Sequence, residues 1–331
     1  MTAALLARLL GTPDKAAAVP AVHWNGVIAA ARAERLLGTL AHRLADQTLP
    51  DQVEALLANA VLDTDRERRQ ALWETDRAQA VLAPLGIPVI LLKGTAYAAA
   101  DLKAGEGRMI GDLDILVPRD RLDDAEEALL DAGWEWVKPD PYDDAYYRRW
   151  MHELPPLIHR DRDRMIDVHH TILPLTARPS PDASALIADS VAVAGDLRIL
   201  SAEDRVCHAV AHMFADGDLA GGLRNLWDIH CLLDEIADHA VLDKRAARHG
   251  LMPHLGRARR LADHIYGNGQ ARLSVIDRLF LRRILATDAW GRDSRKLLGL
   301  TFYIRSHLLR MPPMMLARHL WTKWRKGYRP V

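Results

Sequence analysis

The chain has 331 residues, and 49% of them are hydrophobic, which is enough for a sizeable core and predicts two or three compact units. Its 44 basic and 44 acidic side chains give a formal net charge of zero. Overall charge therefore gives no reason to expect a general nucleic-acid-binding protein. The charge is uneven along the chain, because nine basic and no acidic residues follow residue 293.

Cysteine usage and the N-terminal residues predict where the protein is found. Cys207 and Cys231 are the two cysteines, and both lie in stretches with helical spacing. So few cysteines indicate a reducing compartment without a disulfide framework. The N-terminus lacks a basic segment and is typical of an amphipathic helix rather than a secretion signal. No apolar run approaches the ~20 residues that cross a bilayer, so we expect a cytoplasmic protein.

Residues 1–82 are predicted to form an N-terminal helical region. They are rich in Ala, Leu, Arg and Glu, and apolar side chains such as Leu36, Leu40 and Leu44 recur at helical spacing. A break at 48–51 predicts a turn followed by a new helix start.

Residues 83–175 are predicted to form an α/β core. The aliphatic run at 89–92 indicates a buried strand. A helix at 96–102, a strand at 112–117, a helix at 122–132 and a strand at 134–137 follow. This alternation predicts an α/β (α+β) fold, with a mixed sheet flanked by N-terminal and C-terminal helical regions.

The pattern after this alternation predicts four further features. Residues 138–147 are polar and rich in Pro and Asp, which predicts a loop, and two apolar runs at 157–159 and 165–169 flank a charged turn as in a hairpin. The proline-containing stretch at 173–200 is predicted to be a connector. Ser201 and Asp204 resemble a capping box that starts a long helix through Phe214.

From that helix onward the spacing predicts helices to about Tyr328. We therefore expect a C-terminal helical domain over residues 176–331, ending in the basic tail.

Asp112 and Asp114 are the most informative pair in the chain. They lie two apart in Gly-Asp-Leu-Asp-Ile-Leu-Val, so on a strand both carboxylates point to one face and Leu113 points to the other. Two carboxylates this close repel each other unless a cation lies between them, and Mg²⁺ prefers oxygen ligands. The alternative is two solvated acids on an exposed strand edge.

Asp167 is a candidate third ligand. Alternation in Met-Ile-Asp-Val-His places Asp167 and His169 on one face of the second hairpin strand. A third carboxylate from a neighbouring strand would complete a two-metal clamp for phosphoryl or nucleotidyl transfer. The alternative for Asp167 is a carboxylate that caps a turn. Glu153, His159 or His169 could also reach the cleft, and either histidine could serve as a general base.

The candidate phosphate-binding residues precede the acidic pair. Gly94 and Thr95 lie between a buried strand and a helix, where a glycine allows close backbone approach and the helix N-terminus offers free N–H groups. Lys93 and Arg108 would neutralise the triphosphate. The alternatives are a helix cap for Thr95, a solvated lysine, and a loop salt bridge from Arg108 to Glu106 or Asp112.

Four segments together carry a family resemblance. Leu-Leu-Lys-Gly at 91–94, Arg-x-x-Gly-Asp-Leu-Asp-Ile-Leu-Val at 108–117, Gly-Trp at 133–134 and Ile-Asp-Val-His-His at 166–170 resemble the uncharacterised nucleotidyltransferases of the DNA-polymerase-β-like superfamily. The stretch at 223–230 is similar to the helical C-terminal half of that family.

The resemblance implies an NTP donor and Mg²⁺ or Mn²⁺, with Asp112, Asp114 and Asp167 as metal ligands. It also implies that Gly94 and Gly111 lie near the nucleotide. The superfamily has Gly-Ser in its phosphate-holding turn, and this chain has Gly94-Thr95 instead.

We therefore expect an enzyme that moves an NMP group from an NTP to a hydroxyl or phosphate of an unidentified small molecule, peptide or protein. The alternative is a nucleotide- or protein-binding module of the same fold without turnover. A third hypothesis is a metallohydrolase with His208 and His212 as ligands, although a structural or substrate-facing role is the simpler interpretation of this pair.

The remaining motifs lie in the C-terminal half. Arg224 and Asp228 could pair within one helix or line the cleft. The basic tail, with Trp321 and Trp324, could contact a membrane surface or an acidic partner, could bind RNA or a nucleotide tail, or could pack on the rest of the protein.

Overall fold

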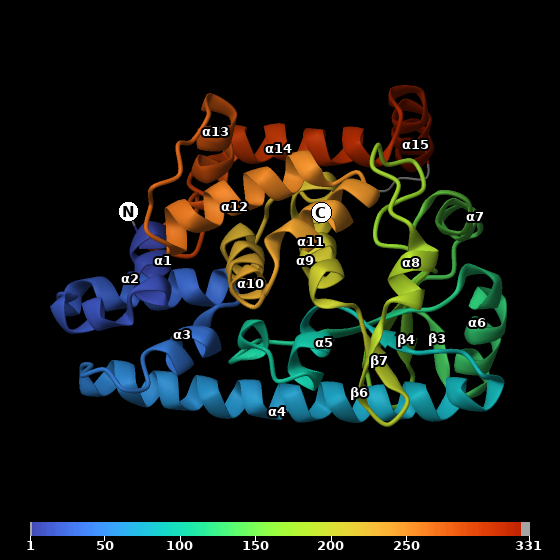
Figure 1. Cartoon of the computed structure of the whole chain (residues 1–331), viewed down its shortest axis with the longest axis horizontal. Coiled ribbons are helices and arrows are strands. Elements are labelled where there is room, and N and C mark those ends of the chain that lie inside the picture. The colour runs from blue at the N-terminus through green and yellow to red at the C-terminus, as the bar shows by residue number, and fades with distance from the viewer. Residues whose placement is uncertain (1, 326–331) are drawn as a thin grey trace.

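A mixed sheet of seven strands lies between helices in the computed structural model, which describes residues 2–325 (Figure 1). The strand order is β3-β4-β5-β2-β1-β7-β6. The strands are β1 (Ile90–Leu91), β2 (Asp112–Leu116), β3 (Trp134–Trp136), β4 (Leu157–His159), β5 (Met165–His169), β6 (Val191–Ala194) and β7 (Leu197–Ile199). The α/β fold expected from the sequence is confirmed.

Helices precede, interrupt and follow the strands. Before the sheet come α1 (Thr2–Gly11), α2 (Ala21–Ala33), α3 (Leu37–Arg43) and α4 (Asp51–Leu82). Between the strands lie α5 (Lys93–Ala99), α6 (Leu122–Asp131), α7 (Pro141–Trp150) and α8 (Ala183–Ala188). After the sheet come α9 (Ala202–Val210), the π-helical turn Ala211–Asp216, α10 (Gly222–Asp234), α11 (His239–Arg248), α12 (Met252–Tyr266), α13 (Val275–Ile284), α14 (Lys296–Arg310) and α15 (Pro313–Arg325).

The layers are visible in Figure 1, where α4 runs along one side of the molecule beneath the strands and α14 lies at the opposite side. One continuous hydrophobic core extends from Ala3 in α1 to Phe302 in α14. All three predicted segments contribute to this core, and their boundaries at 82 and 175 stay a prediction. Among the described residues, no helix has both the length and the apolar character needed to cross a membrane.

The parallel pairing of β2 with β5 positions the acidic residues. Asp114 lies opposite Asp167, and Asp112 lies opposite Met165. Because side chains alternate along a strand, the three aspartates share one face. Leu113 and Ile166 on the other face are buried in the core. The predicted hairpin is confirmed, since β4 pairs with β5 in antiparallel register.

The chain turns sharply after β1, beside the acidic face. β1 pairs antiparallel with β2, and the Leu92 amide donates a hydrogen bond to the Asp114 carbonyl. Lys93 then adopts a left-handed φ of 47° and begins α5. Such a φ is uncommon for a residue other than glycine, and it brings the lysine side chain next to the acidic face.

The predicted loop at 138–147 is wrong, because α7 begins inside it. The Asp140 carboxylate accepts hydrogen bonds from the amides of Tyr142 and Asp143, and Pro141 occupies the first helical turn. Capping aspartate and proline at the helix start stabilise a helix whose polar composition gave no apolar periodicity.

The predicted connector at 173–200 is incomplete, because it contains α8 and the β6–β7 hairpin. Gly195 turns this hairpin with a φ of 57°, which glycine adopts without steric cost. β7 pairs parallel to β1 and so adds two strands to the sheet. The hairpin is short and contains Asp196 and Arg198. These polar residues interrupt the apolar alternation from which a strand is predicted.

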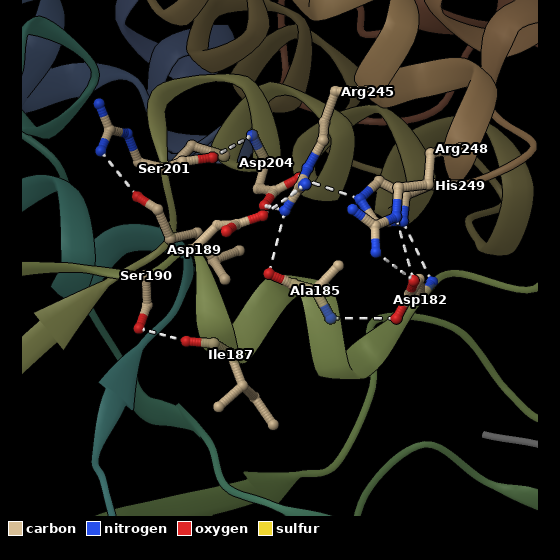
Figure 2. Close-up of polar contacts among 12 residues, drawn as sticks. Asp182, Ala185, Ile187, Asp189, Ser190, Ser201, Asp204, Arg245, Arg248 and His249 are labelled. Carbon is tan, nitrogen blue, oxygen red and sulfur yellow. Dashed lines mark hydrogen bonds and ion pairs between the residues drawn. The ribbon is translucent and has the colours of Figure 1, made fainter.

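The helix expected after Ser201 is present and extends past Phe214, but its geometry changes along its length. Ser201 Oγ accepts a hydrogen bond from the Asp204 amide, as the capping pattern predicted, but α9 ends at Val210 and a π-helical turn continues to Asp216. The Asp204 carboxylate is fully buried. It accepts hydrogen bonds from Arg245 of α11 and from His249, the residue that follows α11 (Figure 2). Burial alone would raise the pKa of Asp204, but these hydrogen bonds lower it.

The last helix has an exposed aromatic face. His319 of α15 contacts Tyr142 of α7, with 3.1 Å between Nδ1 and the hydroxyl oxygen, while Trp321 and Trp324 are exposed. A membrane or acidic-partner contact through this helix stays a prediction. Lys326, Arg329 and the expected continuation to Tyr328 lie outside the described residues.

Candidate functional site

Three carboxylates from two neighbouring strands meet at one point. Asp112, Asp114 and Asp167 each offer an oxygen atom, and these atoms all lie within 4.8 Å of one another. Asp112 is exposed, Asp114 is buried and Asp167 is half-buried. The exposure of Asp112 leaves the cluster open to solvent on one side.

Asp167 is the carboxylate of this cluster whose ionisation is disfavoured by its surroundings. Burial, together with the negative charges of Asp114, Glu153 and Asp112, raises the pKa of Asp167 to about 7. Its Oδ1 atom is buried and has no hydrogen-bond partner. Buried carboxylate oxygens in proteins nearly always have a partner. An oxygen-binding cation between the three carboxylates would supply one, so these residues fit a divalent metal ion.

Asp114 already has two partners among the side chains. Lys93 Nζ lies 2.5 Å from Asp114 Oδ1, and His169 Nε2 lies 2.9 Å from the same oxygen. Burial alone would raise the pKa of Asp114, but the Lys93 charge and the His169 hydrogen bond lower it strongly. Burial alone would lower the pKa of Lys93, and the Asp114 charge raises it instead. Both side chains are therefore charged at neutral pH, and the second carboxylate oxygen can still be offered to a cation.

A cavity of about 410 Å³ adjoins the carboxylates. This volume lies within the range of small-molecule sites. Asp112 and Asp114 line the cavity, together with Lys93, Gly94 and Gly111. Residues from distant parts of the chain complete its wall: Arg35, Arg108, His212, Arg224 and Asn225.

Two arginines of this wall share one buried aspartate. Asp228 accepts hydrogen bonds from Arg108 and from Arg224, whose Nη2 lies 2.6 Å from its Oδ1 atom. Arg224 also donates to the Thr39 hydroxyl, at 2.6 Å. The wall thus joins α3, the segment before β2, and α10. One aspartate balances two guanidinium groups, which leaves this part of the wall with a net positive charge.

Gly94 determines where the Arg108 side chain lies. A Cβ atom added at Gly94 would be 2.5 Å from Arg108 Nε, whereas one added at Gly111 would meet no heavy atom within 4 Å. The absence of a side chain at Gly94 therefore makes room for the guanidinium group rather than leaving open space.

The other candidate residues differ in where they lie and what they contact. Thr95 is buried, its hydroxyl has no hydrogen-bond partner, and it does not line the cavity. Arg108 pairs with Asp228 rather than with Glu106 or Asp112. His159 packs edge-on against Trp134 and accepts a hydrogen bond from the Asp161 amide.

His208 and His212 lie outside the metal-ligand groups found among residues 2–325. His208 is buried, and His212 lines the cavity from the π-helical turn, a feature frequent at functional sites.

Sequence reasoning missed Arg35 and Asn225. Arg35 lies between α2 and α3 with a left-handed φ of 55°. It lines the same cavity as Arg224 and Asn225, which come much later in the sequence. No local pattern indicates such a position. Asn225 lies in the 223–230 stretch beside Arg224, so that resemblance was the one available signal.

The fold and this site define an α/β protein with an acidic cluster at the edge of a cationic cavity. The model of the uncharacterised nucleotidyltransferase family matches residues 20–267, and the chain belongs to this family. The match extends well beyond the motifs at 91–170, and it includes the turn that supplies Arg35 and the helix that supplies Arg224. A comparison with curated proteins finds no match.

Replacing Lys93 by Met tests whether its charge holds the acidic cluster together. The variant leaves the Asp114 carboxylate buried with less counter-charge, so we expect the free energy of unfolding to fall by about 3 kcal/mol. Mg²⁺ should restore more stability to this variant than it adds to the wild type, because it can take the place of the ammonium group. Thermal and denaturant unfolding measure both effects.

Lys244→Met is the matched control, since Lys244 is exposed on α11, and it should change neither quantity. A Lys93→Met variant that is as stable as the wild type without metal would contradict the electrostatic account.

Proposed function

We propose that the protein transfers a nucleoside monophosphate group from an NTP to a hydroxyl or phosphate of an acceptor, with a divalent metal ion bound. The observation that carries this proposal is a cluster of three carboxylates, two of which, Asp112 and Asp114, line a cavity with arginines on its wall. Carboxylates can hold the metal, and arginines can hold the phosphates that the metal accompanies.

Asp112, Asp114 and Asp167 would hold the metal. Bound Mg²⁺ supplies Lewis-acid polarisation and neutralises charge on the transferring phosphoryl group. The chain's own residues orient these ligands. His169 donates its Nε2 hydrogen to Asp114 and so fixes that carboxylate, and the strand pairing holds Asp167 opposite it. Positioning of the reacting groups contributes much of the rate enhancement in catalysis of this kind.

Arg108, Arg224 and Arg35 would bind the phosphates. Arg108 is half-buried and Arg224 is buried, and both are held in place by Asp228, so they lose little side-chain entropy when an anion binds. Arg35, from the turn between α2 and α3, also lines the cavity. Lys93 would neutralise the cluster itself, because its ammonium group is closer to Asp114 than a solvated lysine would be.

One observation favours a second candidate, a nucleotide-binding module without turnover. Lys93 already supplies a counter-charge at 2.5 Å from Asp114 Oδ1, so the cluster is partly neutralised without a metal. Titration calorimetry with Mg²⁺-ATP and the other NTPs, followed by a pyrophosphate-release assay over varied acceptors, separates the two. Binding with pyrophosphate release supports the enzyme, and binding without release supports the module.

Replacing Asp112 by Asn is the sharpest test of the acidic cluster. Asp112 is exposed, so the fold should be unaffected, whereas the loss of one anionic ligand should lower pyrophosphate release by about a hundredfold or more. Asp120→Asn, another exposed carboxylate outside the cluster, should retain full activity. Full activity in Asp112→Asn would refute the assignment.

Replacing Gly94 by Ala tests the phosphate wall. The added methyl group would displace the Arg108 side chain, and we expect NTP affinity to fall by about tenfold, as for the loss of one charge-assisted contact. Gly111→Ala adds the same group to the same cavity without touching another residue, so it measures lost space alone. Equal losses in both variants would show that the position of Arg108 is not what matters.

A further inference from the structure

A second group of metal-ligating side chains lies behind Asp114. His152 and Glu153 follow α7, and His169 ends β5, where it forms an isolated β-bridge with Glu153. One ligand atom from each of the three residues lies within 4.8 Å of the others. The group contains two imidazoles and one carboxylate, whereas the acidic cluster contains carboxylates alone.

The distances within this group suit a single ion. His169 Nδ1 lies 3.4 Å from Glu153 Oε2, and His152 Nε2 lies 3.7 Å from the same oxygen. Ligands bound at roughly 2.1 Å in a tetrahedral site are about 3.4 Å from one another. The side chains therefore require only small movements to coordinate one ion.

The hydrogen bonding of His169 leaves a lone pair facing this group. Its Nε2 atom must donate to Asp114, because an ionised carboxylate only accepts. In the neutral ring, Nδ1 is then an acceptor that faces the Glu153 carboxylate, another acceptor. This Nδ1 atom is buried and has no hydrogen-bond partner, and the His169 side chain is 1% exposed. Two acceptors facing each other inside a protein need a proton or a cation between them.

His152 and Glu153 provide the rest of the coordination. Burial lowers the pKa of His152 well below its usual value. Its Nδ1 atom is also buried without a hydrogen-bond partner. The His152 and Glu153 side chains are 13% and 16% exposed, so the group is not sealed from solvent, and a water molecule would be the fourth ligand.

We propose that His152, Glu153 and His169 form a separate site for a first-row transition-metal ion such as Zn²⁺ or Co²⁺. Imidazole nitrogens favour these ions over Mg²⁺, which takes oxygen ligands. A metal-bound histidine commonly donates its other ring N–H to a carboxylate, and His169 does this to Asp114. The ion would therefore fix the orientation of the His169 ring, and this ring orients Asp114. The ion would thus have a positioning role, separate from the metal ion of the proposed nucleotidyl transfer.

Cobalt titration tests the proposal without an activity assay. The full-length protein is stripped with a chelator, supplied with excess Mg²⁺ to occupy the acidic cluster, and titrated with Co²⁺. We expect visible absorption bands of cobalt in a low-symmetry protein site, saturating at one equivalent, and their displacement by Zn²⁺. If the wild-type protein gives no such bands and calorimetry detects no Zn²⁺ binding under these conditions, the proposal is wrong, and a proton bridges Glu153 and His169 instead.

Two variants locate the ion. His152→Ala and Glu153→Gln should each weaken Co²⁺ binding by about tenfold or more. His254→Ala is the control, because His254 on α12 also has a buried Nδ1 without a hydrogen-bond partner but lies outside the group, and it should bind as the wild type does. Circular dichroism verifies that each variant is folded. Undiminished binding in both cluster variants would place the ion elsewhere and overturn the assignment.

Discussion

The repulsion between like charges at the junction of β2 and β5 is the constraint on which the site depends. The register of these two parallel strands sets Asp114 directly opposite Asp167 and places Asp112 on the same face. Three carboxylates held this close raise one another's pKa unless positive charge is present. Much of the surrounding polar structure supplies that charge. Lys93 follows β1 with an uncommon backbone conformation, and its side chain reaches Asp114. His169, two residues after Asp167 on β5, donates to the same oxygen.

The cavity beside the carboxylates depends on all parts of the chain. Arg35 comes from the N-terminal helices, Arg108 from the segment before β2, and Arg224 from α10. Asp228 and Thr39 join these parts through buried hydrogen bonds. The helical regions are therefore walls of the site and not only supports for the sheet. This agrees with a family match that extends across residues 20–267, far beyond the motif-bearing strands.

Much of the strand pattern could be predicted from sequence, because alternation is a local property. It placed Asp112 and Asp114 on one face, Asp167 and His169 on one face, and the β4–β5 pair around a charged turn. The α7 helix could not be predicted in this way, since its start depends on the Asp140 side chain rather than on apolar spacing.

The long-range partners were beyond sequence reasoning for a different reason. Arg108 and Asp228 are 120 residues apart, and periodicity tells which face a side chain occupies but not which side chain meets it. The same holds for Arg35, whose approach to the cavity depends on how α2 and α3 pack. Glu153 and His152 lie in irregular chain, where no repeat indicates that they meet His169.

The central claim is that the three aspartates bind a divalent ion at the mouth of the nucleotide cavity. Anomalous diffraction from crystals grown with Mn²⁺ and a non-hydrolysable NTP analogue tests it most directly. The account predicts a manganese peak in contact with carboxylate oxygens of Asp112, Asp114 and Asp167, with the triphosphate extending toward Arg108. A bound triphosphate whose manganese lies away from these carboxylates, with Lys93 still on Asp114, would contradict it.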